Sequence, residues 1–202
     1  MRKIYCNVLM VLALVVVVSC GKDENDPKDQ EGITTEEPVT RTINVPSTGT
    51  LTEPVTRYYS LETGLEVNAS EKETKKWDIS FTRMEIRINS AFGVVGLVLK
   101  NKDILNVSEA PQDGYKKEGE FEEEDESGIV SQADNTLFVN WFNYFQAETL
   151  SVQPKPNVYI IKTVSGKYVK LQLLSYYNES GAGGFYKFQY TIQPGGSRQF
   201  EK

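Results

Sequence analysis

The chain has 202 residues, no histidine, and 28 acidic against 22 basic side chains, which gives a formal charge of −6 at pH 7. Without histidine, Ser-His-Asp and Cys-His catalysis and the common His/Cys zinc sites are excluded, so we expect no enzyme, no catalytic residues and no metal site. The acidic excess disfavours nucleic acid as a partner, because binding to phosphates depends on lysine and arginine.

Residues 1–19 have the pattern of a secretory signal peptide. Arg2 and Lys3 precede a continuous apolar run from Val8 to Val18. This run is too short for a membrane-spanning helix, which needs about 20 apolar residues. It ends in the letters VVSC, which resemble the lipobox of bacterial lipoproteins. The resemblance implies cleavage before Cys20 and an acyl anchor, with palmitate among its chains, on the Cys20 sulfur.

Residues 20–40 are expected to form a flexible acidic tether. The segment is rich in acidic residues, Pro, Gly and Thr, and Ile33 is its only large apolar side chain before Pro38, so it cannot build a core. For the same reason, the alternative that Cys20 is buried behind a core helix is disfavoured. Lys22-Asp23-Glu24 resembles the export signal of Bacteroidota lipoproteins, which implies an outer-membrane protein facing the cell exterior. A plain charged tether is the alternative.

Residues 41–202 are expected to form a single, mostly β domain of antiparallel sheets with hairpin extensions. Met84, Ile86 and Ile88 alternate with polar residues, the period of a half-buried strand. Residues 92–100 (FGVVGLVLK) are apolar on both faces, which predicts an inner strand or one that another segment approaches closely. The turn-rich letters VSG and NESGAG separate the last three strand-like segments, which predicts antiparallel hairpins. No long stretch has a sustained helical period.

Two further segments could carry a ligand. The acidic run 118–126 supplies many carboxylates, but such dense like charge favours a solvated loop over a calcium or glycosidase site. In the segment NWFNYF, Trp141 and Phe145 fall on one strand face, and Phe142 and Tyr144 fall on the other. This pattern favours a sandwich core with one face partly covered. The alternative is a flat apolar slot for a planar ligand.

Three segments together resemble the HmuY-like haem-binding lipoproteins of Bacteroidota: KKWDISFTRMEIRINS, VNWFNYF and VYIIKTVSGKYVKLQLLSYYNESGAGGFYKFQYTI. The resemblance follows the chain from Arg57 to Gln193. It implies an all-β body with finger-like extensions that grip haem and deliver it to an outer-membrane transporter for iron acquisition. Family members ligate the iron with two histidines or with methionines, one before the central tryptophan strand and one after it. The corresponding regions, residues 118–135 and the vicinity of Gln146, contain neither residue type.

The choice of haem ligands is therefore narrow. Haem iron takes His, Met, Cys thiolate or Tyr as axial ligands, and after signal removal Met84 is the only methionine. This leaves Met84 alone, a tyrosine such as Tyr144, a Met–Tyr pair, a site shared across a dimer, or porphyrin stacking without a strong bond to iron. Met84 and Tyr144 are the candidate haem-binding residues. The alternatives are that Met84 is a core residue of its strand and that Tyr144 packs on the sheet with its hydroxyl at the rim.

The leading hypothesis is a surface-anchored lipoprotein that binds haem, or a related planar hydrophobic ligand, for uptake. Its partners would be the membrane, through the lipid anchor, and an outer-membrane transporter. The alternative is a non-haem interaction module that binds protein or glycan on the same fold, because a fold does not decide a function. An open cleft beside Phe142, Tyr144 and Met84 would favour the first hypothesis.

Overall fold

A computed structural model describes residues 36–121, 135–146 and 150–201. All of them belong to one structural unit, Gly32–Lys202. The expected signal peptide, Cys20 and most of the acidic run lie outside these ranges, so the interpretation of those segments stays a prediction. Within the described ranges, no helix has the length and apolar character that crossing a membrane requires.

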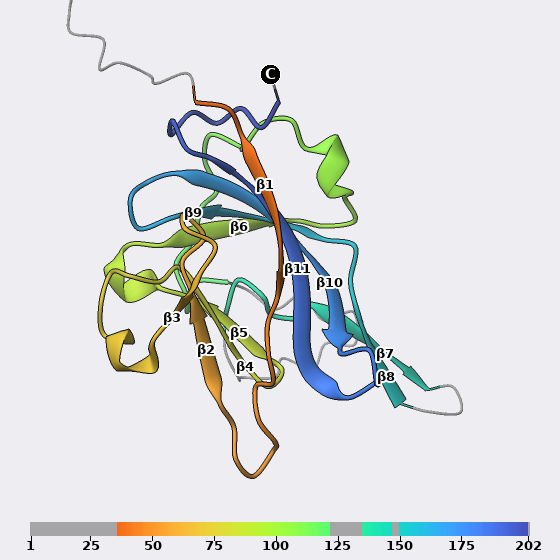
Figure 1. Ribbon diagram of the computed structural model, residues 1–202. Coiled ribbons are helices and arrows are strands. Elements are labelled where there is room, and N and C mark those ends of the chain that lie inside the picture. Colours follow the sequence, from red (N-terminus) through yellow and green to blue (C-terminus); the bar gives the residue numbers. More distant parts are fainter. Residues whose placement is uncertain (1–35, 122–134, 147–149, 202) are drawn as a thin grey trace, which may run out of the picture. The chain divides into compact units, whose positions relative to one another are not determined.

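The larger sheet has five antiparallel strands in the order β1-β11-β10-β9-β6 (Figure 1). Its strands are β1 (Val39–Asn44), β6 (Val95–Leu99), β9 (Val158–Lys162), β10 (Tyr168–Tyr177) and β11 (Gly183–Gln193). The turn between β9 and β10 contains Gly166 with a φ of 85°, a left-handed conformation that glycine adopts without a steric cost. The three C-terminal strands therefore form the predicted antiparallel hairpins.

Strand β6 has an edge position, so the expectation of an inner strand is wrong. The second expectation for this segment, close approach by another part of the chain, is confirmed. A Cβ atom added at Gly96 would lie 2.5 Å from Leu137 Cδ2. Lys116 also forms an isolated backbone bridge with Gly96, on the edge of β6 that does not pair with β9. The segment is apolar on both faces because Leu137 and the hydrophobic core cover it.

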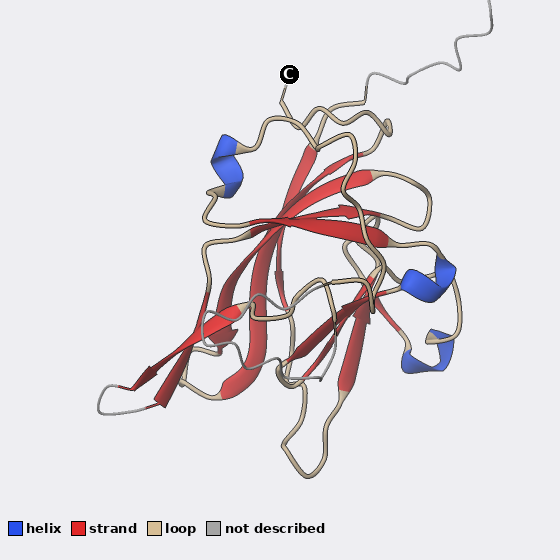
Figure 2. Cartoon of the chain, turned by 180° about the vertical axis from the view of Figure 1, so that it is seen from behind, coloured by secondary structure: helices blue, strands red, loops and turns tan. Residues whose placement is uncertain are grey.

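The smaller sheet has four strands in the order β3-β2-β4-β5. Its strands are β2 (Thr56–Tyr59), β3 (Glu66–Val67), β4 (Ile79–Thr82) and β5 (Glu85–Ile88). Alternate residues of these strands enter the core, and Ile79, Phe81 and Ile86 are at most 1% exposed. The Phe81 ring stacks on Phe188 of β11, with 5.3 Å between the ring centroids. The two sheets thus share one hydrophobic core. Figure 2 shows the strands of both sheets from behind.

A separate hairpin consists of β7 (Phe142–Gln146) and β8 (Leu150–Pro154), and in Figure 1 it extends beyond the ends of β10 and β11. The backbone N–H of Val152 donates a hydrogen bond to the Tyr177 hydroxyl at 2.7 Å, which attaches the hairpin to β10. Within residues 36–121, 135–146 and 150–201, the helical elements are three short 3₁₀ turns: η1 (Ala69–Glu71), η2 (Ser90–Phe92) and η3 (Ile104–Asn106). The prediction of a mostly β fold with antiparallel sheets and a hairpin extension is confirmed.

Candidate functional site

Met84 and Tyr144, the two residues singled out from the sequence, lie in contact. The Tyr144 hydroxyl donates to the Met84 sulfur at 3.4 Å, although 60 residues separate the two in the chain. Tyr144 lies on β7 and is 58% exposed, and Met84 is half-buried at the edge of the core. We call these two side chains the Met84–Tyr144 pair.

Met84 does not lie on its strand as predicted. The register pairs Thr82 with Glu85, so Arg83 and Met84 form the two-residue loop between β4 and β5. The alternation with Ile86 and Ile88 is real, but β5 begins at Glu85, so the reversal of the chain includes Met84 and ends one residue later than the pattern predicts. The reversal places the Met84 side chain at the rim of the core.

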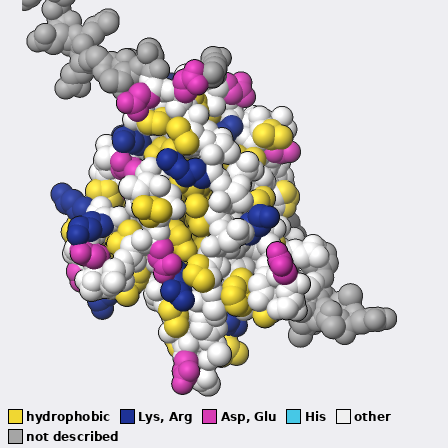
Figure 3. Space-filling model, viewed as in Figure 1, with side chains coloured by type: hydrophobic (Ala, Val, Ile, Leu, Met, Phe, Trp, Pro, Cys, Tyr) yellow, Lys and Arg dark blue, Asp and Glu magenta, His cyan; other side chains and the backbone are white. Residues whose placement is uncertain are grey.

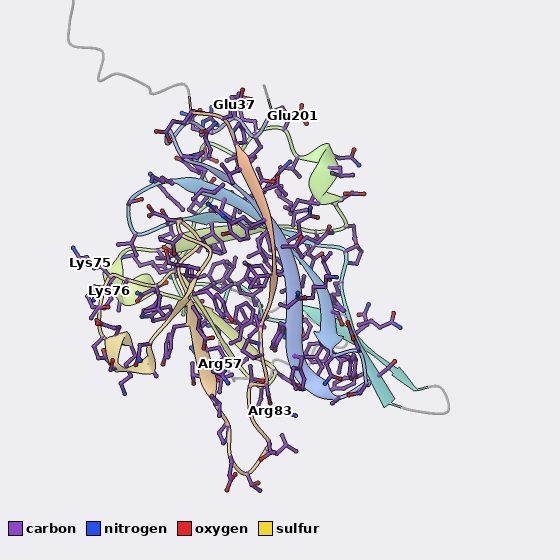
Figure 4. The ribbon with its side chains drawn as sticks, in the orientation of Figure 1. Glu37, Arg57, Lys75, Lys76, Arg83 and Glu201 are labelled. Atoms are coloured by element: carbon purple, nitrogen blue, oxygen red, sulfur yellow. The ribbon has the colours of Figure 1, made fainter. Side chains whose placement is uncertain are left out.

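The loop that carries Met84 is strained and firmly held. Arg83 has a φ of 52°, a left-handed conformation that costs a non-glycine residue about 1 kcal/mol or more. Arg83 Nη1 donates to the carbonyl of Gly49 at 2.7 Å, and the Tyr186 hydroxyl donates to the Arg83 carbonyl. Trp141 Nε1 donates to the Met84 carbonyl at 2.8 Å. Figure 4 shows Arg83 at this end of β4 and β5, beside the loop that follows β1.

A series of aromatic rings connects Tyr144 to the core. The Tyr144 ring lies edge-on to Phe142, and Phe142 lies edge-on to Trp141, each with 4.8 Å between centroids. Trp141 is 2% exposed and packs on Tyr176 and Tyr186. Phe142 is half-buried, so the outer end of the series offers an apolar edge at the surface.

The neighbouring tyrosines are poor candidates for binding a metal. Burial raises the pKa of Tyr176 and of Tyr186 above the usual range, so both remain neutral phenols at physiological pH. The Tyr177 hydroxyl already accepts the hydrogen bond from Val152. Among these four tyrosines, Tyr144 is the one with a largely exposed side chain.

The donor set of the pair fits haem iron, because a thioether and a phenol are both axial ligands in known haem proteins. The Tyr144 hydroxyl oxygen and the Met84 sulfur are in contact. Either one of the two residues would therefore bind the iron alone, or the two side chains would move apart and both bind it. Phe142, Tyr144 and Met84 lie together, and none of them is fully buried. Elsewhere in the described ranges, no group of three or more acidic or cysteine side chains is placed to hold a metal ion.

Several parts of the sequence prediction fall outside the described ranges. These include residues 122–134, which hold most of the acidic run, and residues 147–149, which follow Gln146. The resemblance implied haem ligands in the region 118–135 and near Gln146. The side chains of Phe145 and Gln146 are likewise not described. Sequence reasoning missed Arg83 and the carbonyl contact of Trp141, because a strained loop without glycine has no sequence signature.

Comparisons with known proteins agree on one family. The sequence model of the HmuY protein family matches residues 53–190. No curated protein sequence matches the chain.

Solved structures share the fold. The apo HmuY analogue of Tannerella forsythia has a TM-score of 0.57 at 18% identity and covers 79% of this chain and 98% of its own. Apo PinO of Porphyromonas gingivitis has a TM-score of 0.53 at 16% identity and covers 79% and 100%. A third structure, named as a candidate HmuY-like haem-binding protein of Bacteroides vulgatus, has a TM-score of 0.48 at 20% identity and covers 75% and 90%. At these identities, the likeness concerns the fold alone. The family match, however, spans more than half of the sequence, and the chain belongs to the HmuY family.

Proposed function

We propose that this protein captures haem, or a related planar hydrophobic ligand, at the Met84–Tyr144 pair and passes it on for uptake. The observation that carries the proposal is the contact between the Tyr144 hydroxyl and the Met84 sulfur. Two residue types that bind haem iron meet at an accessible place, although 60 residues separate them in the sequence. Membership of the HmuY family supports the same function.

The surrounding residues would bind and orient the ligand. A bound haem would supply the iron that the thioether or the phenol binds. The half-buried Phe142 provides apolar surface for a porphyrin face, and burial of such surface is the main source of affinity for a planar ligand. Trp141 holds the Met84 carbonyl, so the sulfur is positioned before the ligand arrives.

We extend the proposal to the membrane anchor. After removal of residues 1–19, an acylated Cys20 would attach the protein to the outer membrane, on the cell exterior. Residues 20–40 would then tether the domain with a mean reach of about 25 Å if they behave as a flexible coil. An outer-membrane transporter would receive the ligand. Replacement of Cys20 by serine should abolish incorporation of labelled palmitate into the chain, and a variant that is labelled like the wild type would contradict the anchor.

The test is a haemin titration of the full chain in detergent, followed by visible absorption spectroscopy in the oxidised and reduced states. The variants are Met84→Leu, which removes the sulfur and nearly conserves volume, and Tyr144→Phe, which removes one oxygen. A saturable one-to-one shift of the Soret band is expected, and at least one variant should abolish it. A soft thioether prefers ferrous iron and a hard phenolate prefers ferric iron, so the oxidation state in which each variant loses the shift identifies the ligand.

The matched control is Tyr168→Phe, which removes a tyrosine hydroxyl from β10, a strand of the other sheet, and should leave the titration unchanged. Haemin with detergent alone defines the spectrum without protein. A spectrum indistinguishable from that background would refute haem capture. A shift that survives in the double variant Met84→Leu/Tyr144→Phe would refute the assignment to this pair.

A further inference from the structure

A groove of about 480 Å³ lies on the outer face of the smaller sheet, and neither Met84 nor Tyr144 lines it. Its floor is formed by β2, β4 and β5, and its walls come from the segments around η1 and η2. A volume of this size is typical of sites for small ligands. The haem proposal makes no use of this groove.

The strand register arranges hydrogen-bonding side chains in rows on the groove floor. Tyr58 pairs with Ser80 on the next strand, and Ser80 pairs with Arg87 on the one after it. Thr56 and Thr82 form a second pair, with 2.8 Å between their hydroxyl oxygens. Because side chains alternate between the two faces of a strand, the residues between these positions fill the core. The outer face therefore presents phenol, hydroxyl and guanidinium groups from rigid strands.

Two hydroxyls on this floor have spare hydrogen-bonding capacity. In the described part of the chain, no residue forms a hydrogen bond with the side-chain hydroxyl of Ser80 or Tyr58. Ser80 is only 7% exposed, so its hydroxyl lies at the bottom of the groove rather than in open solvent. A ligand that supplies its own hydroxyl groups would satisfy both side chains.

One wall of the groove is aromatic and rigid. Trp77 belongs to this wall, and its ring packs in an edge-to-face arrangement with Tyr58 of the floor, with 4.9 Å between centroids. Trp77 Nε1 donates to the Lys72 carbonyl at 2.8 Å, and Asn89 Nδ2 donates to the Trp77 carbonyl at 2.9 Å. These bonds fix the wall before any ligand binds, which lowers the entropic cost of binding. Phe92 adds a third ring to the lining.

The charges that line the groove balance. Lys72 and Arg87 are basic, and Glu73 and Glu118 are acidic. This balance provides no excess positive charge for a phosphate or for a pair of carboxylates. Figure 3 shows acidic and basic side chains interspersed over the face that it displays. The lining thus fits an uncharged ligand with many hydroxyl groups and an apolar face.

We propose that this groove binds a short neutral oligosaccharide. Sugar hydroxyls would hydrogen-bond with Tyr58 and Ser80, and the apolar face of a sugar ring would lie against the aromatic wall. The inference is independent of haem capture, because it uses none of the residues of the Met84–Tyr144 pair.

The test measures binding of glucose, galactose, mannose and N-acetylglucosamine trisaccharides to the full chain by saturation-transfer NMR and calorimetry. The detergent must lack sugar headgroups, since these would compete. At least one trisaccharide is expected to bind, and Tyr58→Phe and Ser80→Ala, which each remove one oxygen, should each weaken it about tenfold. Tyr168→Phe, whose hydroxyl lies on the other sheet, should leave the affinity unchanged.

The absence of binding by every trisaccharide at millimolar concentration would overturn the proposal. Binding whose affinity stays within twofold in both groove variants would place the sugar elsewhere and would also overturn it. Thermal unfolding verifies that each variant is folded, and if Ser80→Ala is not, Tyr58→Phe decides the test alone. Haemin takes no part in these measurements, so their failure would leave the haem proposal standing.

Discussion

Asp78 should make the protein more stable as the pH falls from 7.5 towards 4.5. Its carboxylate accepts hydrogen bonds from the backbone N–H groups of Leu61 at 2.8 Å and Val164 at 3.1 Å. These bonds connect the start of β4 to two turns, one after β2 and one after β9. Asp78 is only 3% exposed, and burial, which outweighs both hydrogen bonds, raises the pKa of Asp78 from 3.8 to about 6.

The sign follows from proton uptake. Between pH 6 and pH 4 the folded state holds a proton on Asp78 that the unfolded state lacks, so the free energy of unfolding rises as the pH falls. A difference of about two pKa units corresponds to about 3 kcal/mol, reached near pH 4 and lost as the pH rises through 6. The chain has no histidine, so no side chain with an ordinary pKa near 6 obscures this window. Burial raises the pKa of Glu62, but hydrogen bonds from Ser165, Lys167 and Thr163 together with the charge of Lys167 outweigh burial and lower this pKa. The stability that Glu62 contributes is therefore lost only as the pH falls below about 4.5.

The assay is urea unfolding of the wild type and of Asp78→Asn at several pH values between 4.5 and 7.5. The asparagine keeps one acceptor oxygen and cannot ionise, so the pH dependence in this window should disappear. The replacement loses one hydrogen bond, at a cost of about 1–3 kcal/mol, and avoids a buried charge at neutral pH, so the two stabilities should be similar at pH 7.5. Glu62→Gln is the comparison variant. Because the Glu62 charge also raises the pKa of Asp78, this variant should keep the sign of the slope but reduce its size. A wild type whose stability is flat over this range, or an Asp78→Asn variant with the same slope, would refute the argument.

Three further predictions concern packing and hydrogen bonding. Gly96→Ala should lower the free energy of unfolding by about 1–3 kcal/mol, because the new methyl group would overlap Leu137; denaturant unfolding would check this. Trp141→Phe should cost about 1–3 kcal/mol and weaken haemin binding, because the Met84 carbonyl loses its donor; unchanged haemin affinity would show that this bond does not position the loop. Lys170→Met should destabilise by a similar amount, since the buried ammonium donates to two backbone carbonyls around η3; a neutral effect in the same assay would contradict that role.

Much of the fold could be predicted because hydrophobic alternation is a local signal. The residues Ile79, Phe81 and Ile86 point inward as their two-residue period requires. The position of β6 could not be predicted in the same way. A strand that is apolar on both faces indicates that both faces are buried, but it does not indicate which segment covers them. Here Leu137, 41 residues away in the chain, covers the strand at Gly96.

The sequence could predict which residues belong to the candidate site, but not that they lie in contact. A short list of haem ligands selected Met84, the only methionine left if the expected signal peptide is removed. Tyr144 was selected because it lies beside the position where the resemblance implied a ligand. Their contact depends on the reversal of the chain at Arg83, which has a left-handed backbone conformation. Glycine or asparagine usually occupies such a position in a turn, and arginine gives no sequence signal for it. The groove on the smaller sheet was missed for another reason. The residues of its floor alternate with core residues along each strand, so each of them resembles an ordinary solvent-facing position. The pairing of β2, β4 and β5, which the sequence does not reveal, places them side by side.

A single buried tryptophan connects both halves of the Met84–Tyr144 pair. The side chain of Trp141 holds the Met84 carbonyl, and its backbone leads directly into β7, which carries Tyr144. Trp141 itself is fixed by packing against Tyr176 and Tyr186 in the core. The geometry of the pair is therefore set by the core, whereas the two donor atoms belong to residues at its edge. Residues at that edge can be exchanged without disturbing the core, so a chain without histidine can keep the fold of the HmuY family.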